Sequence, residues 1–129
     1  VSVLPAGVGQ NTVSLTASEA LAANDLVSIW NDVGTAKVRK ADGTTEGKEA
    51  HGFVKAGYAL NASATVSLPG NVMTGRSGMT PGARQYLGTT AGARVESPLS
   101  TTGNVHQMVG IAGSASTLVF EPEEPVTLA

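Results

Sequence analysis

The sequence predicts an all-β fold: a small single-domain β-barrel or sandwich of about nine or ten short, mostly antiparallel strands with an extended N-terminal arm. Short runs of alternating apolar and polar residues recur at the roughly 8–12-residue spacing typical of such folds. Turn-forming residues separate these runs, and the 129-residue chain contains 16 glycines and 6 prolines. Only residues 17–24 have a helix-like composition, and so short a stretch leaves a short helix or an extended connection open.

Each predicted strand is a run whose alternate residues point to opposite faces. In residues 105–112, this alternation is expected to place Val109 and Ile111 on one face, and Met108 and Gly110 on the other. The same pattern predicts strands at residues 11–16, 26–31, 36–40, 50–56, 64–68, 71–73, 85–87, 93–96, 105–112 and 117–121.

The connections between these strands carry recognisable turn residues. Residues 31–34 (NDVG) predict a hairpin loop. Pro81 and Gly82 suit the central positions of a type II turn, because proline presets φ and glycine tolerates a positive φ. Residues 73–79, with Arg76 at their centre, form a longer irregular loop whose ordering costs conformational entropy. We therefore expect a neighbouring subunit to hold this loop.

The chain divides into an arm (residues 1–10), a β domain (11–121) and a tail (122–129). The arm, VSVLPAGVGQ, is apolar but is interrupted by one proline and two glycines, so it is expected to lie on its own domain or on a neighbour. Residues 121–129 contain two prolines and three glutamates, which excludes a central strand and predicts an exposed tail.

The composition favours a protein that works in contact with others. Aromatic residues make up only 4% of the chain, so its core of small side chains removes modest apolar area from water. Only 14% of residues are charged, against about 25% in an average domain. Both features favour oligomerisation or docking on a larger surface. Neither nucleic acid nor a membrane is an expected partner, because no basic face interleaved with aromatics and no long apolar run is present.

The residues that usually carry catalysis do not form a recognisable constellation. The chain has no cysteine, and His51 and His106 lack the spacing of metal ligands. No serine lies in a nucleophile elbow, and the glycines of residues 70–78 lack the ending of a phosphate-binding loop. The sequence therefore predicts a non-enzymatic protein without a metal or another cofactor.

Several segments together resemble small β-domain structural proteins of tailed bacteriophages. Similar segments occur in head decoration (cement) proteins and in domains of tail fibres or other virion appendages, and the resemblance spans most of the predicted β domain. The matching segments are residues 26–29 (LVSI), 36–42 (AKVRKAD), 50–54 (AHGFV), 78–87 (GMTPGARQYL), 105–112 (VHQMVGIA) and 118–122 (LVFEP).

This resemblance implies a virion structural protein, expected to be a homotrimer on the outer surface of the capsid head. Its partner would be the major capsid protein, whose subunits it would bridge and stabilise against internal DNA pressure. The expected contacts come from the apolar arm and from the loop region between residues 73 and 84. The predicted interface residues are Val1, Val3, Leu4, Pro5, Val8, Met73, Arg76, Met79 and Arg84.

The alternative function is a tail-fibre or appendage domain that binds a host-surface receptor or glycan. Such a domain would need exposed aromatic rings for stacking on sugars. The candidates for that role are Trp30, Tyr58 and Tyr86.

Overall fold

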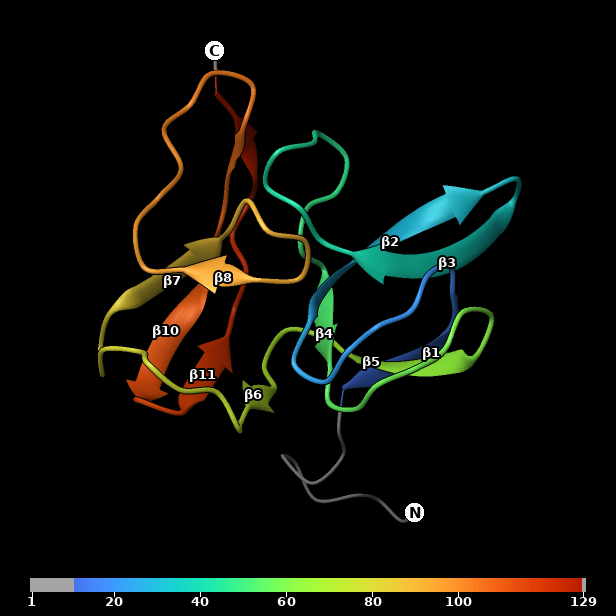
Figure 1. The fold of residues 1–129 in the computed structure, drawn as a ribbon, viewed down its shortest axis with the longest axis horizontal. Coiled ribbons are helices and arrows are strands. Elements are labelled where there is room, and N and C mark those ends of the chain that lie inside the picture. The colour runs from blue at the N-terminus through green and yellow to red at the C-terminus, as the bar shows by residue number, and fades with distance from the viewer. Residues whose placement is uncertain (1–10, 129) are drawn as a thin grey trace.

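The computed structural model describes residues 11–128, which form twelve strands and no helix (Figure 1). The prediction of an all-β fold is confirmed. Residues 18–25 form an irregular connection of bends and a turn, neither helical nor continuously extended, in which Leu21 forms a bridge with Tyr58. The predicted arm, residues 1–10, lies outside the described residues. The strands are β1 Thr12–Ala17, β2 Leu26–Asp32, β3 Thr35–Lys40, β4 Gly52–Val54, β5 Ser63–Ser67, β6 Val72–Met73, β7 Arg84–Leu87, β8 Arg94–Val95, β9 Val105–His106, β10 Met108–Ser114, β11 Thr117–Phe120 and β12 Val126–Thr127.

The first five strands pair in a closed ring in the order β1-β3-β2-β4-β5. Strand β1 completes the ring because it pairs antiparallel with β5 and parallel with β3. The remaining neighbours in the ring are antiparallel. Small buried side chains suit the interior of so narrow a ring. They form a cluster of Ala17, Leu21, Val27, Val38, Val54, Ala64 and Val66.

The later strands form a second sheet in the order β6-β11-β10-β7-β8, beside a two-stranded ribbon of β12 and β9. The ribbon involves the tail, since Val126 and Thr127 pair with His106 and Val105. Both tail residues keep exposed side chains, although their backbone belongs to a sheet. The sequence did not predict this pairing, because a strand of two residues has no periodicity of its own.

One hydrophobic cluster, the shared core, joins the ring to the second sheet. Phe53 from β4 and Phe120 from β11 are fully buried, and their rings meet edge to face with centroids 5.3 Å apart. Because these two rings come from different groups of strands, they attach one group to the other. The members of the shared core are Leu26, Ala41, Ala50, Phe53, Met73, Met79, Leu87, Val109, Ala112, Leu118 and Phe120.

A bulge at Gly110 changes which side chains of β10 face the shared core. The pairing of β10 with β7 shifts register just before this glycine, whose φ is +155°. A Cβ atom there would collide with the carbonyl oxygen of Val119, so glycine is required. After the bulge, Ala112 faces the core and Ile111 is 44% exposed, whereas Val109 is buried. The expectation that Val109 and Ile111 share one face is therefore wrong.

Both predicted turns are present. In the type II turn, the amide of Ala83 donates to the carbonyl of Thr80 at 2.9 Å, and Gly82 has a φ of +82°. The β2–β3 hairpin closes through two residues with positive φ, Val33 at +50° and Gly34 at +87°, as a type I′ turn requires.

The loop formed by residues 73–79 is held by its own chain. The amide of Arg76 donates to Ser116 at 3.1 Å, and that of Met79 donates to Ala115 at 3.2 Å, so the loop runs along the β10–β11 turn. These bonds, together with the burial of Met79, offset the entropy of ordering the loop. The expectation that a neighbouring subunit is needed to hold it is therefore corrected.

Glu96 accepts hydrogen bonds from the segment that follows this loop, residues 80–85. Its Oε2 accepts hydrogen bonds from the amide of Thr80 at 2.6 Å and from Nε2 of Gln85 at 3.0 Å, and its Oε1 accepts from the Thr80 hydroxyl at 3.1 Å. The backbone bond from Thr80 is the largest cause that lowers the pKa of Glu96 below its ordinary value of 4.5, followed by the bond from Gln85.

Acid is therefore expected to weaken the fold through Glu96. Because the pKa of this carboxyl is lower in the folded than in the unfolded chain, its contribution is present above the unfolded value and is lost as the pH falls through the folded value. Glu96→Gln is expected to reduce the loss of stability between about pH 7 and about pH 3, measured by urea denaturation at each pH. Glu46→Gln, in an exposed loop, is the matched control. Equal acid sensitivity of wild type and Glu96→Gln would contradict the assignment.

Candidate interaction surfaces

The two histidines of the chain, His51 and His106, do not belong to a metal-holding cluster in the described part of the chain. Among residues 11–128, no group of three or more histidines, aspartates or glutamates is placed to hold a metal ion. Nδ1 of His51 accepts a hydrogen bond from the amide of Ile29 at 2.9 Å, and His106 packs against Tyr86 with ring centroids 5.5 Å apart. Both histidines thus have contacts that support the fold. In the same part of the chain, no helix has the length and apolar character needed to cross a membrane.

The predicted interface residues fall into three groups in the structure. Those of the arm, Val1, Val3, Leu4, Pro5 and Val8, lie outside the described residues. Two others are core residues, which the sequence placed on the surface. The remaining two are arginines, of which one is half-buried and one is exposed.

Met73 and Met79 are corrected from interface residues to core residues. Their exposed fractions are 0% and 4%, and both belong to the shared core. Met73 faces inward because it pairs with Leu118, which is also buried. Their side chains are therefore not available to a partner of the folded protein.

The two arginines differ in their surroundings. Arg76 is half-buried, and its Nη2 donates to the carbonyl of Asn24 at 2.5 Å. Burial is the largest cause that lowers the pKa of Arg76, Arg94 lowers it further, and Asp25 opposes both. Arg76 therefore links its loop to the ring, whereas Arg84 is exposed on β7.

The three aromatic residues of the glycan-binding alternative do not form one platform. The Trp30 indole donates to the Ser18 hydroxyl at 2.9 Å, and the Arg39 guanidinium covers its ring at 4.5 Å. Tyr58 packs against the cluster inside the ring, whereas Tyr86 lies on the second sheet. Trp30 and Tyr58 therefore belong to the ring, and only Tyr86 belongs to the second sheet.

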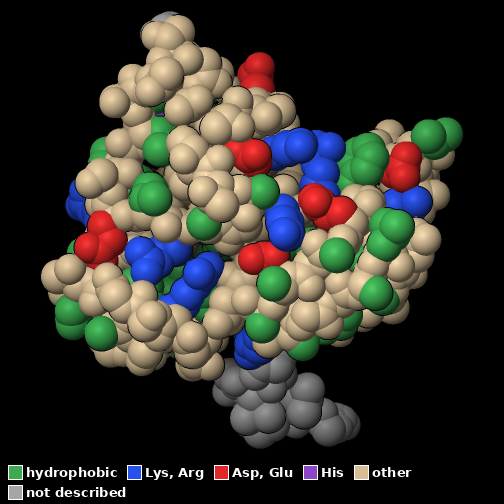
Figure 2. Space-filling model, in the orientation of Figure 1, with side chains coloured by type: hydrophobic (Ala, Val, Ile, Leu, Met, Phe, Trp, Pro, Cys, Tyr) green, Lys and Arg blue, Asp and Glu red, His purple; other side chains and the backbone are tan. Residues whose placement is uncertain are grey.

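One candidate surface, the loop-tip surface, consists of Val33 and Leu60. Val33 is 97% exposed in the β2–β3 turn, and Leu60 is 58% exposed in the segment between β4 and β5. Both segments lie at the end of the ring that points away from the second sheet (Figure 1). Figure 2 shows a hydrophobic side chain at the projecting hairpin tip. Two apolar side chains are thus presented where they contribute little to the core.

The backbone conformation of Val33 is unfavourable for a valine. A β-branched residue with φ near +50° is an outlier, because its side chain crowds the backbone in the left-handed region. The strain costs on the order of 1–2 kcal/mol. Asparagine, which tolerates this conformation, would suit the position before Gly34 better. The fold alone therefore does not explain a valine at this position.

The second candidate surface is the outer face of the second sheet. A row of directly paired residues crosses four strands on this face, from Val72 through Val119 and Ile111 to Arg84. Val72 and Ile111 are 42% and 44% exposed. Their chain neighbours face the shared core, so this row faces outward. The outer face is therefore an apolar strip with a cation at one end.

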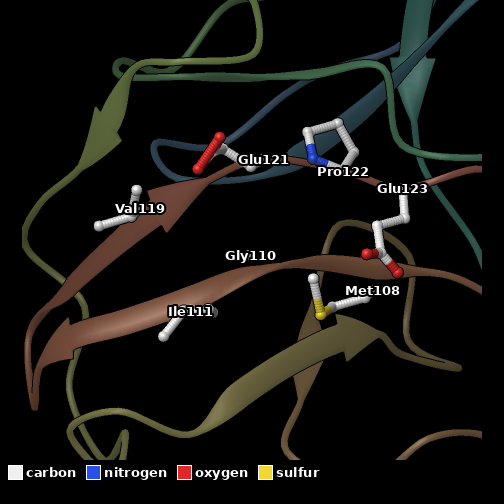
Figure 3. A pocket seen from close by; sticks show the side chains of 7 residues that line it. All are labelled: Met108, Gly110, Ile111, Val119, Glu121, Pro122 and Glu123. Atoms are coloured by element: carbon white, nitrogen blue, oxygen red, sulfur yellow. The ribbon is translucent and has the colours of Figure 1, made fainter.

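A cavity of about 560 Å³ hollows this face. Val119 from β11 and Met108 and Ile111 from β10 surround a floor at Gly110, where no side chain fills the space (Figure 3). The segment after β11 forms the other side, with two carboxylates and a proline. These residues are Glu121, Pro122 and Glu123.

Comparison of the chain with protein-family models, curated proteins and solved structures finds no match.

Proposed function

We propose that the protein is a non-enzymatic structural component of a tailed-bacteriophage virion. It binds the outer surface of the capsid head as a homotrimer and bridges subunits of the major capsid protein. The proposal is supported by the resemblance of six sequence segments to head decoration proteins. It is also supported by two exposed apolar side chains, Val33 and Leu60, at one end of a β-domain.

The observation that carries the proposal is the strained and exposed Val33. Contact with a larger surface would bury this side chain and recover about 1.5 kcal/mol or more of hydrophobic free energy. The shared core makes the hairpin part of a larger folded unit, so a contact at its tip can resist movement between two shell subunits. Two shell subunits that are bridged in this way can separate only if the contact with the bridging protein breaks as well.

The test is the substitution Val33→Asn, which separates folding from binding. Asn-Gly is a preferred pair for a type I′ turn, so the variant is expected to be more stable than wild type by about 1 kcal/mol. Its affinity for capsid shells assembled without the decoration protein is expected to fall about tenfold, because the buried methyl groups are lost. Chemical denaturation measures the first effect, and co-sedimentation with the shells measures the second.

Val126→Asn is the matched control, because Val126 is 55% exposed on the ribbon, away from the loop-tip surface. This control is expected to leave shell binding unchanged. Unchanged binding by Val33→Asn would overturn the role of the loop tip, and absence of wild-type binding would overturn the capsid proposal. Imaging of virions tests the location independently: protein confined to the tail would favour the receptor- or glycan-binding alternative.

A further inference from the structure

A smaller cavity, which we call the Tyr86 pocket, lies on the outer face of the second sheet. Its volume is about 270 Å³. Pockets for drug-sized ligands usually measure about 300–1,000 Å³, so this cavity suits a ligand of about one ring. It is lined by Arg84, Tyr86, His106, Met108, Ile111 and Glu123.

Strand pairing brings the central side chains of this pocket together. The residues that alternate with Arg84 and Tyr86 along β7 are buried, so Arg84 and Tyr86 face outward. On the neighbouring strand β10, Ile111 pairs with Arg84 and Met108 pairs with Tyr86. A cation and an aromatic ring therefore stand beside two apolar side chains.

The Tyr86 ring is held in place before any ligand arrives. Its backbone lies in β7, between β10 and β8. The ring contacts that of His106, with centroids 5.5 Å apart and planes inclined at 43°. His106 is itself paired with Val126 in the two-stranded ribbon. A ring that is already packed loses little freedom on binding, so the pocket has a preorganised aromatic surface.

The carboxylate of Glu123 is attached to a fixed backbone. The amide of Glu123 donates to the carbonyl of Met108 at 2.8 Å, and its carbonyl accepts from Nε2 of Gln107 at 3.2 Å. The side chain points toward the side of β10 on which Met108 lies (Figure 3). A group that only accepts hydrogen bonds when ionised is thus placed at the pocket.

The fold does not use the polar ends of three of these side chains. Among residues 11–128, the Arg84 guanidinium, the Tyr86 hydroxyl and the Glu123 carboxylate have no hydrogen-bond or ion-pair partner. Arg84 and Glu123 have opposite charges and line the same cavity, yet no ion pair joins them. A ligand that lies between them therefore needs an anionic group for Arg84 and hydrogen-bond donors for Glu123.

A saccharide that carries a carboxylate supplies both groups. Its carboxylate can accept two parallel hydrogen bonds from the guanidinium of Arg84. Its hydroxyls can donate to Glu123. The C–H groups of its ring are weakly positive and suit the negative face of an aromatic ring such as Tyr86. A neutral sugar lacks the partner of Arg84, and a small anion lacks the ring and the hydroxyls.

We infer that the Tyr86 pocket binds a sugar acid, with its carboxylate on Arg84, its ring against Tyr86 and its hydroxyls on Glu123. The pocket lies on the second sheet, whereas the loop-tip surface lies at the end of the ring that points away from this sheet (Figure 1). The inference does not rest on the proposed function, because saccharide binding is measured on the isolated protein.

The first test is a titration of the isotopically labelled full chain with D-glucuronate, followed by amide chemical shifts in NMR spectra. We expect saturable shift changes that are largest at residues 84–86, 106–111 and 123. Glucose, which lacks the carboxylate, and acetate, which lacks the ring, are each expected to bind several-fold more weakly. Absence of saturable changes, changes centred elsewhere, or equal affinity for glucuronate and either control ligand would overturn the inference.

Two substitutions separate the contributions to binding. Arg84→Gln removes the charge, so it is expected to abolish the preference for glucuronate over glucose and to leave the affinity for glucose unchanged. Tyr86→Leu stays apolar but loses the aromatic face, so it is expected to weaken the binding of both sugars several-fold. Lys37→Gln, which removes one positive charge from β3 of the ring, is the matched control and is expected to change neither affinity.

The preference for one sugar over the other is measured within one protein, so a partly unfolded variant cannot mimic its loss. Persistence of the preference in Arg84→Gln, or an equal loss in Lys37→Gln, would overturn the inference, whether or not the protein binds capsids.

Discussion

Replacing Phe53 with alanine is expected to destabilise the protein by about 3–5 kcal/mol, the largest effect predicted for this chain. Phe53 is fully buried, and its ring meets Phe120 edge to face. The substitution removes apolar contacts and leaves a cavity between the ring and the second sheet, which close-packed neighbours fill only in part. Guanidinium denaturation of both proteins measures the difference. Leu60→Ala, at an exposed loop, is the control and is expected to change stability by less than about 0.5 kcal/mol.

The number of transitions in the unfolding curve tests whether the two groups of strands share one core. Because Phe53 and Phe120 belong to different groups of strands, wild-type protein is expected to unfold in one transition. A double-mutant cycle with Phe120→Ala is expected to show coupling of about 0.5–1.5 kcal/mol beyond the loss of buried area. Strictly additive effects, or two separate transitions in the wild type, would contradict a core shared between the two sheets.

Removing the side chain of Gln107 is expected to have the second-largest effect. Oε1 of Gln107 accepts from the amide of Ala50 at 2.8 Å, and Nε2 donates to the carbonyls of Ala50 at 3.0 Å and Glu123 at 3.2 Å. Gln107 is only 2% exposed, so Gln107→Ala deprives buried backbone groups of their partners. A loss of about 2–4 kcal/mol is expected, since each unsatisfied buried group costs about 1–3 kcal/mol. Urea denaturation measures it.

Gln107→Glu supplies a sharper comparison for this site. Its carboxylate can still accept from the amide of Ala50 but cannot donate to either carbonyl, and its charge would be buried. At neutral pH we expect it to destabilise the fold at least as much as alanine does, and to recover in part when acid protonates the carboxyl. A stability within about 0.5 kcal/mol of wild type for Gln107→Ala would show that the three bonds contribute little.

The local features of the fold could be predicted because nearby residues determine them. Proline followed by glycine suits few conformations other than a type II turn, and residues 80–83 form that turn. Alternation over the early strands correctly indicated extended structure.

The positions of Ile111 and Met79 could not be predicted, since each depends on contacts distant in sequence. Ile111 lies on the outer face only because a bulge at Gly110 reverses the alternation, and the collision that requires this glycine involves Val119 on the next strand. Met79 lies in a loop without periodicity, and its burial follows from the loop's bonds to the β10–β11 turn. The cavity on the outer face, which is lined by Gly110 at the bulge and by the segment after β11, has no local sequence signal for the same reason.

The closed order of the ring also constrains how fast the protein can fold. Strand β1 is synthesised first, yet its partner β5 follows much later: Thr12 pairs with Ser67. Closing so long an intervening segment costs chain entropy before any pairing energy is gained. All-β chains dominated by such distant contacts fold in about milliseconds to seconds. Until β5 emerges, the edge of β1 that β5 later covers is open to association with other chains, so assembly at high concentration depends on the rate of ring closure.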